Sequence, residues 1–189
     1  METEKTKNKK EANAAAPKKR VNSKAKGSGF EGKVSKILSE SFAPMKFART
    51  PGSGARVGGQ NFGAFGKFFS QEALNLFVGD VVPVNEQDCE NNFRFIVECK
   101  AYKDAEKLEA LLSGSSNIYK WMEEVLVDSS KVERDGIVIF KWNNTPLYAA
   151  VIESITLPNI PRIILNNGIQ VVHLQQLLEF KEFWFKPKK

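Results

Sequence analysis

Two apolar segments of the chain carry carboxylates and a lysine at a spacing that favours metal-assisted chemistry. Asp80 lies in the run 76–82, and Glu98 and Lys100 lie in the run 93–100. Residues i and i+2 of a strand project from the same face, so Glu98 and Lys100 should point to one side, within reach of Asp80 on a neighbouring strand. Converging carboxylates repel each other unless a cation lies between them. The pattern therefore indicates a site for a divalent cation, Mg²⁺ or alternatively Mn²⁺, held together with a phosphate of the substrate.

Lys100 beside such a cation could position the attacking water and help to deprotonate it. The cation would lower the pKa of this water and stabilise charge on the phosphate. The same residues also fit a plainer interpretation, in which Asp80 ends a strand and Glu98 pairs with Lys100 on a solvated sheet face. The pattern alone leaves both interpretations open.

A helix is predicted to precede these strands. Its apolar positions follow the spacing of an amphipathic helix, and they are Phe30, Val34, Ile37, Leu38 and Phe42. Ser28 is the predicted N-cap, with Glu31 completing a capping box, and the helix should end before Pro44.

The remaining patterns predict a mixed sheet with helices packed on it. A polar connection at 85–92 separates the strands 76–82 and 93–100, which favours antiparallel neighbours. The other predicted elements are a short strand from residue 47, a helix at 118–126, a hairpin of 136–140 with 147–152, a strand at 169–172 and a helix at 174–183. This order predicts one α/β domain.

Charge divides the chain into a body and basic ends. Residues 1–26 hold nine Lys or Arg against three Glu, which equals the whole net charge of +6. They contain no aromatic residue, so we predict a disordered basic arm followed by a domain at 27–185 and a basic tail at 186–189. Such an arm suits a polyanion such as DNA, although a solubility tail or a localisation signal would also explain it. Six glycines at 52–66 indicate a flexible Gly/Phe-rich insertion at 55–75.

The location predicted from the sequence is cytoplasmic, in a prokaryotic cell or a virus-infected host cell. No apolar run reaches the length of a membrane span, and the N-terminus lacks a secretory signal. Cys89 and Cys99 offer neither metal-ligand spacing nor a disulfide framework.

Three blocks, in order, resemble the PD-(D/E)XK nuclease superfamily, and most closely its archaeal-type Holliday junction resolvases. The blocks are Lys26-Gly27-Ser28-Gly29-Phe30-Glu31, Arg49-Thr50-Pro51-Gly52-Ser53-Gly54, and Gly79-Asp80 with Val97-Glu98-Cys99-Lys100. Each block is common by itself, but the ordered set is specific. The resemblance implies a restriction-endonuclease-like fold and a metal-dependent endonuclease that hydrolyses DNA phosphodiesters.

The resemblance also implies a role for each matching residue. Asp80 and Glu98 would hold the metal with Glu31 as an additional acid, Lys100 would be the catalytic lysine, and Ser53 would lie near the scissile phosphate. Lys26, Arg49 and Arg56 would bind the DNA. A branched substrate such as a Holliday junction, cut by a homodimer with two sites, is the leading expectation.

Some features depart from the resolvase pattern. Gly79 replaces the usual proline, the segment 55–75 is longer than in a compact resolvase, and the region after Ile152 is additional. Alternatives are therefore a nuclease of restriction or repair type acting on linear or flapped DNA, a non-catalytic DNA-binding module, and a neutral scaffold with a basic arm.

The remaining candidate residues have plainer interpretations. Trp121 fits the core, Trp142 fits the core or a dimer contact, and the single histidine, His173, fits packing rather than catalysis or zinc binding. Phe62, Phe65, Phe68 and Phe69 fit either stacking on unpaired bases or a loop folded onto the body. Lys103 and Lys107 fit a solvated face or phosphate contacts.

Overall fold

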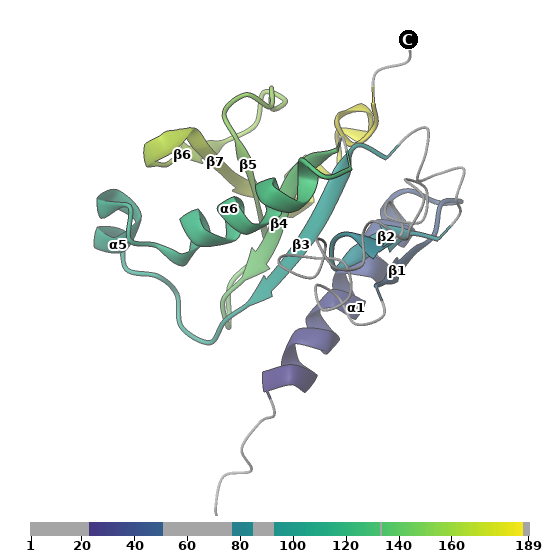
Figure 1. Cartoon of the computed structure of the whole chain (residues 1–189), viewed down its shortest axis with the longest axis horizontal. Helices are drawn as coiled ribbons and strands as arrows, with labels where there is room; N and C mark the ends of the chain where they lie inside the picture. Colours follow the sequence, from purple (N-terminus) through teal and green to yellow (C-terminus); the bar gives the residue numbers. More distant parts are fainter. Residues whose placement is uncertain (1–22, 51–76, 85–92, 133, 187–189) are drawn as a thin grey trace, which may run out of the picture.

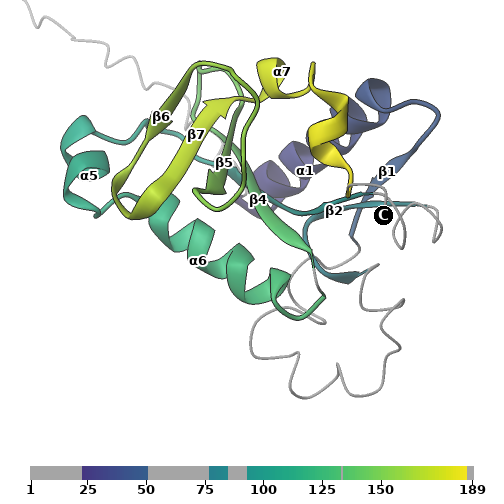
Figure 2. The ribbon, with the colours of Figure 1, turned by 90° about the horizontal axis from the view of Figure 1, so that it is seen from above.

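The computed structural model describes residues 23–50, 77–84, 93–132 and 134–186. In these ranges seven strands form one mixed sheet with the order β1-β2-β3-β4-β5-β7-β6, and helices cover both faces (Figures 1 and 2). The strands are β1 (Phe47–Arg49), β2 (Val81–Pro83), β3 (Phe95–Ala101), β4 (Asp135–Lys141), β5 (Tyr148–Ile152), β6 (Arg162–Ile164) and β7 (Ile169–His173). The helical elements are α1 (Ser23–Ser41), α5 (Leu108–Ser113), α6 (Asn117–Ser129), α7 (Leu174–Leu177), η2 (Asn166–Gly168) and η3 (Lys181–Trp184). The predicted α/β sheet flanked by helices is confirmed.

Strand β3 is paired on both of its edges. It pairs antiparallel with β2, where Val81 is opposite Val97, and parallel with β4, where Val97 is opposite Ile137. A parallel pair needs a crossover connection, and α5 with α6 provides it. The antiparallel arrangement predicted for β2 with β3, and for β4 with β5, is confirmed.

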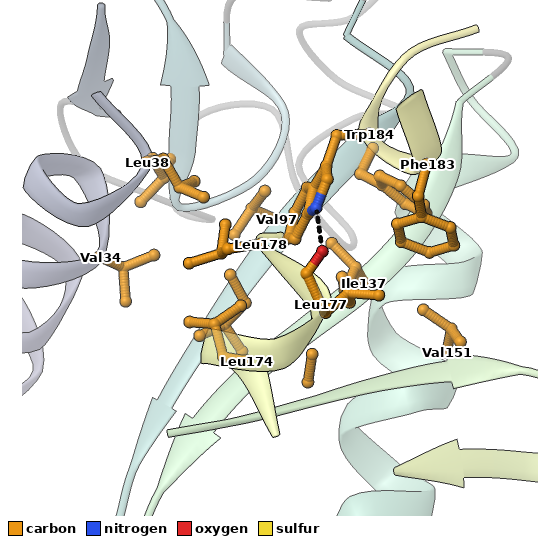
Figure 3. Packing of buried hydrophobic residues seen from close by; sticks show 14 of the residues in the cluster. Val34, Leu38, Val97, Ile137, Val151, Leu174, Leu177, Leu178, Phe183 and Trp184 are labelled. Atoms are coloured by element: carbon orange, nitrogen blue, oxygen red, sulfur yellow. Dashed lines mark hydrogen bonds between the residues drawn. The ribbon is translucent and has the colours of Figure 1, made fainter. Parts of the chain in front are cut away.

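Helices α1 and α7 cover one face of the sheet (Figure 2). The apolar stripe predicted for the first helix is buried there, and its most buried members are Phe30, Val34, Leu38 and Phe42. They pack against odd-numbered residues of β3, including Phe95 and Val97, and against the C-terminal helices (Figure 3). This packing fixes α1 beside β3.

Helix α6 covers the opposite face. Its buried residues include Trp121, Met122 and Val125, which confirms the core position predicted for Trp121. They belong to one cluster with the β3 and β4 residues Ile96, Val138 and Phe140. Because side chains alternate along a strand, the α6 face is also the face on which Glu98 and Lys100 are expected to lie.

The predicted start of the first helix is wrong. Helix α1 begins at Ser23, so Ser28 and Glu31 lie inside it rather than forming a capping box at its end. Residues 23–26, which were predicted to belong to the arm, are part of this helix. Glycine in a helix costs only about 1 kcal/mol relative to alanine, so Gly27 and Gly29 are insufficient to end a helix that is anchored by a buried apolar face.

Two other predicted elements are shorter than expected. Strand β2 begins only at Val81, because Gly79 has a φ of +95°, which is incompatible with an extended strand. The predicted helix 174–183 is divided into α7 and η3. The break lets Trp184 enter the core, where its indole N–H donates to the carbonyl of Leu177 over 3.1 Å (Figure 3).

Several predictions concern residues outside the described ranges. These are most of the basic arm, the whole Gly/Phe-rich insertion 55–75 with its four phenylalanines, and most of the tail. Among the described helices, none is both long enough and apolar enough to cross a lipid bilayer.

Candidate active site

Asp80, directly before β2, is held in place by hydrogen bonds of the backbone around it. Its N–H donates to the carbonyl of Val97 over 2.8 Å, and its own carbonyl accepts from the N–H of Thr50 over 2.9 Å. Its carboxylate Oδ2 accepts from the backbone N–H of Cys99 over 2.8 Å. Asp80 is only 7% exposed, so its carboxylate has a fixed position next to the segment of β3 that carries Glu98.

Glu98 and Lys100 project together from β3, as the strand alternation predicts. The Nζ atom of Lys100 lies 2.9 Å from Oε1 of Glu98. Val97 and Cys99 turn to the opposite face and pack in the α1 core. The sequence prediction that Asp80, Glu98 and Lys100 meet at one place is therefore matched by the geometry.

Burial and a neighbouring negative charge disfavour ionisation of Glu98. Desolvation, followed by the charge of Asp80, raises the pKa of Glu98 from 4.5 to about 7, and Lys100 only partly offsets this. Two neighbouring carboxylates that are both buried are costly to keep charged unless a cation lies between them. The site is thus suited to accept positive charge.

Lys100 stays protonated in this arrangement. Burial alone would lower the pKa of Lys100, but the charge of Glu98 and hydrogen bonds to Glu98 and Glu124 outweigh it and raise the pKa above its ordinary value. A lysine whose proton is held this firmly is poorly suited to accept one from water. Its geometry instead favours orienting groups and stabilising negative charge as an ammonium ion.

Glu31 approaches from the α1 side and is paired with Arg49 of β1. Arg49 Nε donates to Oε2 of Glu31. The pKa of the Cys99 thiol is raised mainly by burial, and the negative charge of Glu31 is one of the smaller causes. Cys99 lies on the face of β3 that α1 covers. Glu31 therefore lies near the part of β3 that contains Cys99, and its carboxylate is already paired with Arg49.

Asp80 and Glu98 are the residues that fit a metal ion best. Mg²⁺ is usually held by one or two carboxylates, with water and phosphate completing its shell. In the described ranges no group of three or more His, Cys, Asp or Glu side chains is placed to hold one metal ion. The role of Glu31 as an additional metal acid stays a prediction.

Glu124 is a site residue that the sequence analysis missed. It lies on α6, and its Oε2 accepts a hydrogen bond of 2.9 Å from Nζ of Lys100. The available signal was an acidic residue beside the apolar stripe of a helix next to the site strands. Helical spacing alone could not decide whether Glu123 or Glu124 would face β3.

The other candidate residues are placed as follows. Ser53 and Arg56 lie outside the described residues, and Lys26 lies in the first turn of α1, so their predicted contacts with substrate stay predictions. Trp142 is half-buried, and its ring packs against Phe140 and Tyr148. The ring of His173 is next to that of Tyr148, away from the candidate site.

A comparison with models of protein families shows to which family the chain belongs. Residues 22–176 match the model of the family described as "Phage putative PDDEXK endonuclease". The chain belongs to this family. Its fold is accordingly of the restriction-endonuclease type, and its family is one of nucleases of the PD-(D/E)XK superfamily. Searches of curated proteins and of solved structures gave no significant match.

The raised pKa of Glu98 predicts how the metal-free protein responds to pH. Between pH 4.5 and about 7 the folded chain keeps a proton that the unfolded chain releases, so stability should fall as pH rises through this window. The full loss is at most about 3 kcal/mol. Urea unfolding from pH 4.5 to pH 8 should show that Glu98→Gln flattens this decline.

Added Mg²⁺ should stabilise the wild-type protein most above pH 7, where Glu98 is ionised, because the cation competes with the proton.

The prediction for the metal-free protein would be wrong if the unfolding free energies of the wild type and Glu98→Gln changed in parallel with pH. Glu98 would then ionise as freely in the folded chain as in the unfolded one.

Proposed function

We propose that this protein is a Mg²⁺-dependent endonuclease that hydrolyses DNA phosphodiesters at branched sites, with Mn²⁺ as an alternative metal. The observation that carries the proposal is the meeting of Asp80, Glu98 and Lys100 at one place, with Glu31 and Arg49 beside it. The membership in an endonuclease family supports the same reaction class.

The residues divide the chemistry between them. Asp80 and Glu98 would hold the divalent cation, which supplies charge stabilisation on the phosphate and a more acidic water. Lys100, as an ammonium ion, would orient the attacking water and stabilise the negative charge that develops on the phosphate oxygens. Arg49 and Ser53 would position the phosphate, and water would replace the leaving oxygen on phosphorus.

Arg49 could bind a DNA phosphate in addition to Glu31. Its guanidinium is paired with Glu31, but the Arg49 side chain as a whole is 40% exposed, so it could contact a DNA phosphate while remaining next to Glu31. Arginine suits this role because its planar donors match phosphate geometry. Lys26 and Arg56 are proposed to extend the contact along the DNA backbone.

Sequence features support the branched substrate. The block Arg49-Thr50-Pro51-Gly52-Ser53-Gly54 resembles that of the junction resolvases, and it precedes a segment rich in glycine and phenylalanine. Phenylalanines can insert where stacking is already broken, whereas unstacking intact duplex costs a few kcal/mol per step. A homodimer would present two sites to two of the four strands of a junction.

The test is cleavage of matched DNAs in Mg²⁺. Labelled four-way, flapped, linear and single-stranded substrates of shared sequence should be cut at different rates, with the four-way junction fastest. Replacing Phe62, Phe65, Phe68 and Phe69 with alanine should reduce this preference more than it reduces Ca²⁺ binding. Cleavage of linear duplex as fast as four-way junctions would reject the branched substrate and leave a nuclease of restriction or repair type.

A further inference from the structure

Lys100 is held between two carboxylates that come from different elements. Its Nζ lies 2.9 Å from Oε1 of Glu98 on β3 and 2.9 Å from Oε2 of Glu124 on α6. The Lys100 side chain is 21% exposed, and that of Glu98 is 20% exposed, so Lys100 itself is sheltered from water although Glu124 is 45% exposed. An exposed pair would contribute little, whereas a lysine this sheltered depends on its partners for its position.

Helix α6 presents Glu124 from a rigid base. The neighbouring residues Trp121 and Val125 are buried under the helix, against β3 and β4. At the start of α6, the hydroxyl of Ser116 accepts from the N–H of Ile118 over 3.1 Å and caps the helix. The carboxylate of Glu124 is therefore delivered to Lys100 by an anchored element.

The two carboxylates come from different elements and differ in exposure. Glu98 interacts electrostatically with Asp80 and is one of the two residues that fit a cation. Glu124 reaches Lys100 from α6, and its side chain is 45% exposed. A cation held by Asp80 and Glu98 would draw on the charge of Glu98 and repel the Lys100 ammonium. Glu124 would then be the partner that keeps Lys100 in place.

We propose that Glu124 is a positioning residue that holds the Lys100 ammonium in the site when Glu98 engages the divalent cation. The inference rests on the proposed nuclease function and adds a residue outside the blocks that carry the family resemblance. Glu124 acts through Lys100 and does not bind the metal itself.

Three variants separate this role from general effects. Glu124→Ala should lower kcat by about 10-fold, as for loss of a supporting residue behind a site, while KM changes by less than about twofold. Glu124→Gln should recover part of the loss, because its amide oxygen can still accept from Lys100. Glu123→Ala, which alters the adjacent exposed acid of the same helix, should match the wild type.

The dependence on Lys100 is tested with a double-mutant cycle. In a Lys100→Ala background, Glu124→Ala should cause no further loss of the residual cleavage, since the residue through which it acts is gone. An equal loss of activity in both backgrounds would overturn the positioning role. Ca²⁺ titration by calorimetry without DNA should give the same affinity for wild type and Glu124→Ala, and a large drop would make Glu124 a metal ligand instead.

A readout without catalysis keeps this proposal separate from the nuclease proposal. In protein with isotope-labelled lysine, the Lys100 side-chain NMR signal, identified by its absence in Lys100→Ala, should stand apart from those of exposed lysines. It should move toward them in Glu124→Ala but not in Glu123→Ala, and an unmoved signal would overturn the pairing on which the inference rests. A wild-type chain that cuts no DNA would instead overturn the proposed function, even where the NMR result confirms the pairing.

Discussion

Asp80→Asn, Glu98→Gln and Lys100→Ala are each expected to slow DNA cleavage by at least about 100-fold, the size of effect seen when a charge-stabilising group is removed from an active site. The first two changes preserve size but remove the charge that would hold the cation, and the third removes the ammonium. Single-turnover cleavage in Mg²⁺ measures the effect. Binding of DNA in Ca²⁺ should survive in all three variants.

The exposed acid Glu123 provides the matched control, because Glu123→Gln removes one negative charge without touching the site. Near-normal cleavage by any of the three site variants would remove that residue from the catalytic group. A loss of DNA binding equal to the loss of cleavage would place the residue in substrate binding.

Gly79→Ala is expected to destabilise the fold by about 3 kcal/mol, from backbone strain and crowding together. Gly79 has a φ of +95°, and an added Cβ would lie 3.0 Å from Cγ2 of Ile96 and 3.1 Å from the carbonyl oxygen of Val97. That carbonyl also accepts from the N–H of Asp80, so relief of the contact would shift Asp80. Cleavage should therefore fall by at least about 10-fold, because catalysis is sensitive to small misplacements.

Gly114→Ala is the control for this prediction. Gly114 also has a positive φ, +77°, but an added Cβ there would meet nothing within 4 Å. Its loss of stability should be smaller and its cleavage unchanged. Thermal and urea unfolding of both variants give the comparison, and equal stability losses would show that close approach to β3 has no role at Gly79.

The same geometry explains the departure of this chain from the superfamily pattern at Gly79. Proline fixes φ near −65°, which is far from the +95° found here. Gly79→Pro, although it introduces the residue usual in the superfamily, should be worse than Gly79→Ala. Glycine at position 79 therefore allows this turn to adopt a positive φ and to pack closely against β3.

Most of the fold could be predicted because the spacing of residue types over short stretches of sequence indicates the helices and strands. The alternation around Glu98 and Lys100 gave their shared face, and the apolar stripe from Phe30 to Phe42 gave the helix that covers the other face. The ordered blocks pointed to the nuclease superfamily, and the family comparison confirmed it. These features depend on residue types at short spacings, which a sequence displays directly.

Other features depended on contacts between distant segments. The starts of α1 and β2 were misplaced, since the start of a helix responds to packing and the turn at Gly79 responds to the close approach of β3. The parallel pairing of β3 with β4 and the division of the C-terminal helix had no local signal either.

The sequence by itself determined the superfamily, the mixed sheet and the group Asp80, Glu98 and Lys100, because strand periodicity and motif order specify them. Only the tertiary structure decided the charge states and partners within that group. Burial together with Asp80 raises the pKa of Glu98. The packing of α6 across β3 brings Glu124 to Lys100, because a pKa and an ion pair depend on distances through space that residue spacing along the chain does not contain.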